Sequence, residues 1–472
     1  MSERMSAADA ALLHFVSERG FTHAASISVI EGDVSFDEYT RDLELRVQAL
    51  PRLRQVPAPV PFNLAYPTWE YDSAFRFADH VDHIRLDPPG TWEQLLSVAS
   101  RLYSVRLDPH RPAWFAYLIG GLEGGHSAVL FKVHHAITDG VGAEEFQRVL
   151  YGAELPAPVG SPLDRVPAPP GPFKRIGSAL RDDAKSICRT VRRIPGTIVG
   201  LGRWLVSEEA RRAVRVQRDY LRAEAVRFPF NIPCTGNVKL AATKFLLEDF
   251  RTIGRACDAT VNDILLAVVG RAVQSYAALH NIDTAGKSLK VQMPVNMRDE
   301  SDPRNMGNIA TIAQVPVPLD AAGPIDTLHA IARHTRALKQ SRAPLAMHRL
   351  IGATLFLVTP VFAPMLQRSV ASLKCQRHTF HASRKPGATF VVSNVPRRPV
   401  PLYIAGHRLS MRYAFGSPAP HIGIGCIAMT CGVHLGVTFS ANAEGAGDLD
   451  RLVALVEQAF EELSAATTTS SH

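Results

Sequence analysis

The chain has 472 residues, of which 46% are hydrophobic and 20% are charged, which is typical of a globular protein and excludes a disordered one. Its length exceeds that of one ordinary core, so two domains of roughly 200 residues each are expected. The net charge of +8 is compatible with nucleic acid, an anionic membrane surface or an anionic substrate as partner. Six cysteines with no C-x-x-C pair argue against a disulfide framework or a zinc ribbon and favour a reduced cytosolic compartment. The N-terminal residues lack the pattern of a signal peptide.

The first 154 residues alternate between strand-like and helix-like patterns. A period of two predicts strands, and apolar residues spaced three and four apart predict helices. Strands are expected at 24–30, 113–119 and 128–133, and helices at 7–16, 36–50, 92–105 and 142–151. This interleaving indicates a mixed α/β domain.

A proline-rich linker is predicted at 155–172, followed by a strongly basic segment at 174–227. The basic segment holds fourteen Lys and Arg and six Asp and Glu, so it carries the whole net charge of the chain. Apolar residues such as Trp204 lie among these charges. The pattern fits an amphipathic element on an anionic lipid surface, or a solvated connector between two lobes. No nucleic-acid-binding motif accompanies it. The lipid-surface hypothesis predicts weaker binding to anionic vesicles when four arginines are neutralised: Arg211, Arg212, Arg215 and Arg218.

A second α/β region begins at residue 231. Strands are expected at 238–247, 289–294, 309–317, 388–392 and 422–439, and helices at 250–257, 261–279, 325–340 and 449–463. Residues from 465 are rich in Thr and Ser and are expected to form a frayed, disordered tail. The uncharged stretch 350–367 is barely long enough to span a bilayer and contains two prolines, which favours a buried or membrane-surface helix.

The segment His134-His135-Ala136-Ile137-Thr138-Asp139-Gly140 is the strongest chemical signal. It follows the strand expected at 128–133 and precedes a helix, so the sequence predicts a loop that exposes a histidine at the strand end. Histidine has a pKa near neutrality and can take a proton from an alcohol that attacks a thioester. A buried structural histidine pair and a metal site through His134, His135 and Asp139 are the alternatives. The glycine pattern at 423–428 lies within strand-like sequence and is a weak dinucleotide signal.

This segment resembles the HHxxxDG motif of CoA-dependent acyltransferases, a superfamily that includes peptide-synthetase condensation domains. Within it, the chain resembles the bacterial wax ester synthase/diacylglycerol acyltransferase family over nearly its whole length. Further blocks resemble segments of the family: Leu107-Asp108-Pro109-His110-Arg111-Pro112-Ala113-Trp114, Val261-Asn262-Asp263, Met293-Pro294-Val295-Asn296-Met297-Arg298, Gly307-Asn308 and Ser393-Asn394-Val395-Pro396. Ala113, Phe115 and Arg397-Arg398 depart from the usual pattern, which puts the acceptor class in doubt.

The resemblance implies an α/β fold of two lobes like chloramphenicol acetyltransferase, with an active-site tunnel between them. The expected division is 1–154 for the first lobe, 155–230 for the linker, 231–464 for the second lobe and 465–472 for the tail. By analogy, His135 is the general base, His134 is supportive and Asp139 is structural. Four residues are expected to bind substrate: Gly140, Asn262, Ser393 and Asn394. Asn262 could instead be a helix N-cap, and Ser393 and Asn394 could serve a turn.

The implied activity is transfer of a long-chain acyl group from acyl-CoA to diacylglycerol or a fatty alcohol, without a cofactor, a metal or an acyl-enzyme intermediate. The protein is then expected in the cytoplasm, peripherally attached to the inner membrane or a lipid body. Two alternatives remain open. The acceptor or donor could be a specialised metabolite or carrier-linked, or the protein could be a non-catalytic lipid-surface protein.

Overall fold

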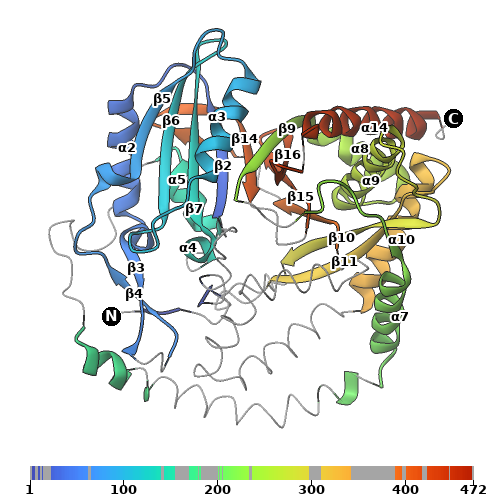
Figure 1. Ribbon diagram of the computed structural model, residues 1–472, viewed down its shortest axis with the longest axis horizontal. Coiled ribbons are helices and arrows are strands. Elements are labelled where there is room, and N and C mark those ends of the chain that lie inside the picture. Colours follow the sequence, from blue (N-terminus) through green and yellow to red (C-terminus); the bar gives the residue numbers. More distant parts are fainter. Residues whose placement is uncertain are drawn as a thin grey trace.

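The protein folds into two α/β lobes, shown in the computed structural model in Figure 1. The structure describes these residues: 3–5, 9–10, 13, 23–61, 65–139, 143–154, 170–178, 180–181, 200, 202–204, 206–232, 236–296, 310–341, 388–395, 400–416, 422–445 and 447–469. Each lobe is built on one mixed sheet with helices packed against it, so the predicted fold class is confirmed.

The first lobe contains a six-stranded sheet. In spatial order its strands are β13 (Tyr403–Ile404), β14 (His407–Gly416), β2 (His23–Ile30), β7 (His126–His134), β6 (Trp114–Leu122) and β5 (Val81–Arg85). Helices α2 (Phe36–Gln48) and α5 (Ala143–Tyr151) cover one face, and α3 (Trp92–Ser104) covers the other. Helices α2 and α3 begin at capping boxes, in which Ser35 and Thr91 satisfy free helix N–H groups.

Shorter elements complete this lobe. A small sheet pairs β1 (Glu3–Arg4), β4 (Thr68–Tyr71) and β3 (Gln55–Ala58). The 3₁₀ turn η1 (Pro51–Arg54) leads from α2 into β3, and a second one, η3 (Phe77–His80), leads into β5 of the larger sheet.

The second lobe contains a seven-stranded sheet. Its main order is β11 (Ala310–Pro318), β10 (Lys287–Asn296), β12 (Phe390–Val395), β15 (Ile424–Cys431), β16 (His434–Asn442) and β9 (Val238–Leu246), with β8 (Glu224–Ala225) paired to β10. Its helices are α8 (Leu247–Cys257), α9 (Val261–Leu279), α10 (Pro324–Ser341), α14 (Leu449–Thr469) and α7 (Glu208–Arg222).

The largest buried cluster of the second lobe lies between this sheet and helices α8, α9, α10 and α14. The glycine pattern at 423–428 belongs to this core. A Cβ at Gly423 would lie 2.5 Å from Phe230, so close packing against Phe230 requires this glycine.

Strand β14 joins the two lobes. It lies late in the chain, within the range that the sequence assigns to the second lobe, yet it pairs antiparallel with β2 of the first sheet. Its other side packs on β16, where a Cβ at Gly436 would lie 2.5 Å from Met411 Cε. Two serines of α3 add to the junction, because Ser104 Oγ and Ser100 Oγ accept the N–H groups of Val238 and Leu240 at 3.0 and 3.1 Å. The lobes therefore share one apolar interface.

The predicted tail is partly wrong. Helix α14 continues to Thr469, so residues 465–469 are helical rather than disordered. The hydroxyl of Thr467 donates to the Leu463 carbonyl at 2.8 Å, and this side chain is only 7% exposed. Local hydroxyl bonds and burial against α8 thus offset the low helix propensity of threonine. Residues 470–472 lie outside the described residues.

Nearly every other predicted helix and strand within the described ranges is present, with ends shifted by a few residues. The uncharged stretch 350–367 and most of the proline-rich linker lie outside those ranges. Among the residues that are described, no helix is long and apolar enough to cross a membrane.

Candidate active site

The two motif histidines lie at the junction of β7 and α4 (His135–Asp139). His134 is the last residue of the strand and is buried, whereas His135 is the first residue of the helix and is exposed. The loop predicted after the strand is therefore a helical turn. Figure 1 shows α4 at the inner, lower end of the first lobe. Adjacent residues at a strand end point in opposite directions, which explains why one histidine is enclosed and its neighbour is accessible.

Two hydrogen bonds fix His134. Its backbone N–H donates to the Ala113 carbonyl at 2.8 Å, and its ring Nδ1 accepts the N–H of Ala136 at 3.2 Å. The second bond satisfies one of the N–H groups that the first turn of a helix leaves unpaired. It also places the ring proton on Nε2. Burial, followed by the nearby His135, lowers the pKa of His134 to about 4, so this ring is neutral at physiological pH.

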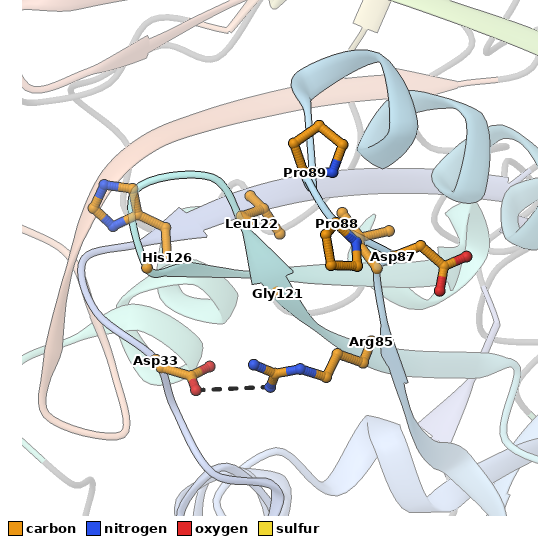
Figure 2. Close-up of a pocket in the computed structure, with 10 residues that line it drawn as sticks. Asp33, Arg85, Asp87, Pro88, Pro89, Gly121, Leu122 and His126 are labelled. Carbon is orange, nitrogen blue, oxygen red and sulfur yellow. Dashed lines mark ion pairs between the residues drawn. The ribbon is translucent and has the colours of Figure 1, made fainter.

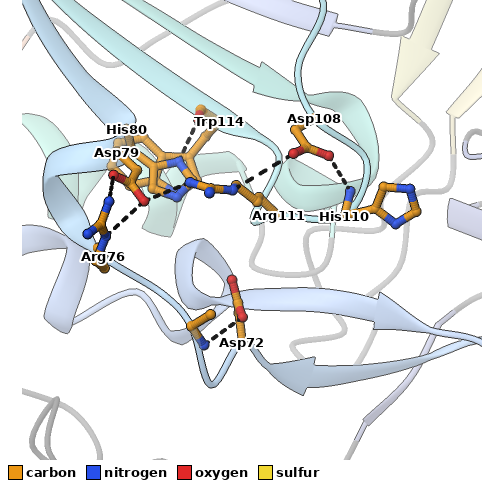
Figure 3. Close-up of polar contacts among 9 residues, drawn as sticks. Asp72, Arg76, Asp79, His80, Asp108, His110, Arg111 and Trp114 are labelled. Atoms are coloured by element: carbon orange, nitrogen blue, oxygen red, sulfur yellow. Dashed lines mark hydrogen bonds and ion pairs between the residues drawn. The ribbon is translucent and has the colours of Figure 1, made fainter.

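Strand β6, which pairs with the strand that holds His134, begins at the block 107–114, and Figure 3 shows polar contacts of Arg111 and Trp114 in this block. Trp114 Nε1 donates to the Leu53 carbonyl at 2.7 Å, and the Trp114 carbonyl accepts from His80 Nδ1 at 3.0 Å. Arg111 Nη1 donates to Asp79 Oδ2 at 2.7 Å. These contacts fix the start of β6, and the Ala113 carbonyl that meets His134 lies at that start.

His23 is a site residue that the sequence analysis missed. It lies directly opposite His134 in the pairing of β2 with β7, with ring centroids 6.0 Å apart. Burial, and then the positive charge of Lys132, lowers its pKa to about 3. Tyr103 supports it by donating its hydroxyl to the His23 carbonyl at 2.7 Å. No local motif marks His23, because only the register of two distant strands brings it to the motif.

Lys132 lies on the same face of β7 as His134, two residues earlier, and is 1% exposed. Its ammonium group donates to the carbonyls of Leu102 and Val105 at 2.9 and 2.6 Å, at the C-terminal end of α3. A cation is favoured there by the helix dipole and by unpaired carbonyls. Burial nevertheless lowers the pKa of Lys132 to about 8.

Two buried arginines hold α5, the helix that follows the motif. Arg46 donates to the carbonyls of Val149 and Gly152 at its C-terminal end, at 2.7 and 3.0 Å. Arg412, from β14, donates to Gln147 Oε1 at 2.6 Å and lies 3.9 Å from the centre of the Tyr151 ring. The chain segment on the C-terminal side of the motif is thus fixed from both halves of the sequence.

The remaining motif residues are only partly described. Asp139 ends α4, and the structure describes its backbone but not its side chain, while Gly140 lies outside the described residues. The structural role predicted for Asp139 and the substrate contact predicted for Gly140 stay predictions. Among the residues with described side chains, no three His, Cys, Asp or Glu residues are grouped as metal ligands.

The structure brings Asn262 and Asn394 together in the second lobe. Asn394 Nδ2 donates to Asn262 Oδ1 at 2.7 Å. Asn394 Oδ1 is buried, and the described part of the chain offers it no hydrogen-bond donor. The N-cap alternative for Asn262 is wrong, because Thr260 is the N-cap of α9 and Asp263 completes its capping box. Ser393 and Asn394 lie within β12 rather than in a turn.

A cavity of about 440 Å³ lies at the other end of the first sheet, lined by Asp33, Arg85, Asp87 and His126 among others (Figure 2). His126 begins β7 and His134 ends it, so at about 3.3 Å per residue the two ends lie about 26 Å apart. This cavity therefore does not contain the motif histidines. Its walls carry both signs of charge, including an Arg85–Asp33 pair at 3.8 Å.

The comparison with protein families agrees with these features. Residues 5–265 match the wax ester synthase/diacylglycerol acyltransferase catalytic domain, and residues 306–464 match the C-terminal domain of the same family. The chain belongs to this family. Together the two matches cover most of the sequence, so the family resemblance carried by the motif blocks is confirmed. Family membership makes the protein an acyltransferase of the wax ester and diacylglycerol type, which acts in neutral lipid synthesis.

Related proteins and structures are similar over nearly full length. A putative diacylglycerol O-acyltransferase of Mycobacterium tuberculosis is 26% identical over 438 residues, which cover 88% of this chain and 86% of the relative. A probable diacylglycerol O-acyltransferase of the same species is also 26% identical, covering 97% and 98%.

Two solved structures have the same fold. The wax ester synthase/diacylglycerol acyltransferase from Marinobacter aquaeolei VT8 aligns with a TM-score of 0.63 at 20% identity, over 98% of this chain and 100% of that one. The first condensation domain of the CDA synthetase aligns with a TM-score of 0.58 at 15% identity, over 99% and 96%.

Proposed function

We propose that this acyltransferase moves a long-chain acyl group from acyl-CoA to the hydroxyl group of diacylglycerol or a fatty alcohol. The observation that carries the proposal is the difference between the two motif histidines. His135 is exposed, whereas His134 is buried and its Nδ1 is held by a hydrogen bond from the Ala136 N–H. The names of the mycobacterial relatives support diacylglycerol as acceptor, and the family description supports fatty alcohols as well.

In the proposed reaction, His135 is the general base. A ring nitrogen of His135 takes the proton of the acceptor hydroxyl while its oxygen bonds to the thioester carbonyl carbon. The carbon–sulfur bond then breaks, and the proton passes from His135 to the departing CoA thiolate. Bonds and protons balance without an acyl-enzyme, a metal or another cofactor, because the thioester is already activated. A positioned base of this kind contributes about 10²- to 10⁴-fold in rate.

His134 is proposed as a positioning residue. Its Nδ1 is occupied by the Ala136 N–H, and a pKa near 4 makes its ring a poor base. Both properties fit a side chain that fixes the first turn of α4 and hence the direction of His135. Asp139 and Gly140 are proposed to hold the other end of that turn and to line the acyl path.

The second lobe is proposed to supply substrate contacts through Asn394, with Ser393 beside it. The hydrogen bond from Asn394 Nδ2 to Asn262 Oδ1 fixes the amide orientation and leaves Asn394 Oδ1 as a buried acceptor. A buried acceptor without a donor costs free energy. A substrate N–H or O–H would satisfy it, and the amides of the CoA pantetheine arm and the acceptor hydroxyl are suitable donors.

The test is turnover of radiolabelled palmitoyl-CoA by purified enzyme, with dioleoylglycerol and hexadecanol as acceptors. His135→Ala is expected to lower kcat by at least 10²-fold with little change in KM for acyl-CoA. His134→Asn, which can still accept the Ala136 N–H, is expected to retain much more activity. Undiminished turnover by His135→Ala would refute the assignment of the base.

A carrier-linked donor is the second candidate, and it is favoured by the condensation-domain fold alone. The same assay decides between the two donors when palmitoyl-pantetheine bound to a carrier protein replaces palmitoyl-CoA. A higher kcat/KM with the carrier-linked donor than with palmitoyl-CoA would identify the carrier-linked acyl group as the preferred donor.

We also propose that the enzyme works in the cytoplasm as a peripheral protein of the inner membrane or a lipid body. Diacylglycerol and long-chain alcohols reside in such phases, so an enzyme that uses them gains substrate access by binding there. The net positive charge of the chain lies in residues 174–227, which supports binding to an anionic membrane surface.

A further inference from the structure

Helix α7 is firmly packed on the second lobe. Its N-cap is Ser207, whose hydroxyl accepts the Ala210 N–H at 3.2 Å. Gln217 Nε2 donates to Gln314 Oε1 of β11 at 2.8 Å. One face of α7 is buried against α10 and β11, and Figure 1 shows both helices at the periphery of this lobe. The buried residues of this face are Ala210, Ala213, Val216 and Tyr220.

The opposite face of α7 carries a row of arginines. The outward row, here called the arginine stripe, consists of Arg211, Arg215, Arg218 and Arg222, all exposed. At about 100° per residue their directions fall within an arc of about 60°, centred opposite the buried face. The stripe is about 17 Å long at 1.5 Å per residue.

Little in the described part of the protein neutralises this stripe. Arg211, Arg215 and Arg222 form no ion pair with any described residue, and Arg218 meets only its exposed neighbour Asp219, at 3.8 Å. Arg212 behaves differently, because it lies off the stripe and pairs with Glu208 at 3.0 Å. The helical geometry therefore revises the set expected from the sequence, which contained Arg212 and lacked Arg222.

Two large apolar side chains flank the stripe on one side. Val214 is 67% exposed and Leu221 is 65% exposed, and they lie seven residues apart on the same edge of the helix. Both lie outside the buried face of α7, which packs on the lobe through Ala210, Ala213, Val216 and Tyr220. An edge of exposed apolar residues beside a row of cations matches the boundary between lipid headgroups and acyl chains.

We infer that the arginine stripe of α7, with Val214 and Leu221, is the surface that docks this enzyme on an anionic phospholipid membrane. This inference rests on the proposed membrane-surface function and specifies its contact. Arginine recognises phosphate with several N–H donors at once, so the stripe meets a row of lipid phosphates. Nucleic acid also offers phosphates, but it gives no role to the exposed Val214 and Leu221.

The docking surface also has a fixed position relative to the lobes. The basic segment is attached to the first lobe near its start, because Arg175 forms a two-bond ion pair with the buried Glu70 of β4. Near its other end, α7 is attached to the second lobe. Membrane contact through α7 would therefore act on a rigid part of the enzyme and set its orientation toward the lipid phase.

The experiment measures binding of the full chain to phosphatidylcholine vesicles with and without phosphatidylglycerol, by co-sedimentation. The stripe variant replaces all four arginines with glutamine: R211Q, R215Q, R218Q and R222Q. A matched control removes the same charge from scattered exposed arginines on other elements: R41Q, R101Q, R408Q and R451Q. A basic residue near an anionic surface contributes roughly fivefold in binding, so the stripe variant should lose at least a hundredfold and the control far less.

Three further readouts sharpen the result. V214S with L221S should weaken binding to the same vesicles without changing the net charge. Binding to duplex RNA measured in parallel identifies a nucleic-acid surface, and loss of RNA binding with intact vesicle binding would overturn the inference. Equal loss in the stripe variant and its control, or no loss in either, would also overturn it. Because vesicle binding needs no turnover, and activity on detergent-dispersed substrate is measured separately, failure here is distinguishable from failure of the proposed catalytic function.

Discussion

His23 and His134 face each other across the β2–β7 pair, with ring centroids 6.0 Å apart and ring planes at 70°. Both rings are buried, and both have pKa values lowered far below that of a free histidine, to about 3 and about 4. Two neutral imidazoles thus lie on adjacent strands, and one of them, His134, directly precedes the exposed His135. Protonation of either ring would place a charge in a site that cannot solvate it, which gives the site a defined sensitivity to acid.

The first prediction concerns this sensitivity. Because the unfolded protein binds protons to His134 near pH 6.5 but the folded protein only near pH 4, the free energy of unfolding falls as the pH drops through this interval. In His134→Asn, the decrease in the free energy of unfolding between pH 6.5 and pH 4 should be smaller than in the wild type, by about 1–3 kcal/mol. Urea denaturation at a series of pH values measures it, with the exposed His110→Asn as control. Parallel curves for wild type and His134→Asn would contradict the lowered pKa.

The second prediction concerns Lys132. Its folded-state pKa of about 8 lies below the value of 10.5 for a free lysine, so between these pH values the unfolded state holds the proton more tightly. The free energy of unfolding should therefore rise from pH 8 to pH 10.5 through this residue. Lys132→Met should remove that part of the rise, whereas Lys339→Met, at an exposed position of α10, should not. The same pH slope in all three proteins would contradict the lowered pKa of Lys132.

The third prediction concerns Arg412, which connects β14 to α5. Its guanidinium donates to Ser26, Ser28 and Gln147 and packs on Tyr151, all within the first lobe. Arg412→Met should lower the free energy of unfolding by about 2–4 kcal/mol, because three polar groups lose a charged partner inside the protein. Thermal and urea denaturation measure the loss.

The matched control for this variant lies on the same strand. Arg408→Met removes an equal charge from β14, but Arg408 is exposed, so a change within about 0.5 kcal/mol is expected. Comparable losses in Arg408→Met and Arg412→Met would mean that the buried network contributes nothing of its own.

The fourth prediction concerns Asn394. Asn394→Leu removes the buried acceptor Oδ1, so kcat/KM for acyl transfer should fall by roughly tenfold or more if a substrate donor binds there. Ser393→Ala, one residue earlier on β12, should cost less, because it removes no buried unpaired acceptor. Steady-state kinetics against both acyl-CoA and the acceptor show which substrate loses affinity. Unchanged kinetics with an intact thermal transition would limit Asn394 to a structural pair with Asn262.

The sequence by itself determined much of this protein. Hydrophobic periodicity located most helices and strands, because burial of one face repeats at 3.6 residues in a helix and 2 in a strand. The apolar run that follows Asp263 predicted the helix at 261–279 with its observed bounds, although its N-cap is Thr260 and not Asn262, the candidate that the sequence offered. The sequence also identified His134 and His135 as candidate site residues, because the whole motif lies in seven consecutive residues, 134–140.

Only the tertiary structure decided which distant residues complete that site. Nothing near His23 in the sequence indicates a functional histidine, and its place opposite His134 depends on the register of two strands over a hundred residues apart. The same holds for β14, which lies late in the chain but pairs in the first sheet. Register and strand order arise from packing between segments that are far apart in sequence, so no local pattern contains them. The arginine stripe differs in kind, because its charges are visible in the sequence while the buried face of α7 decides which of them point outward.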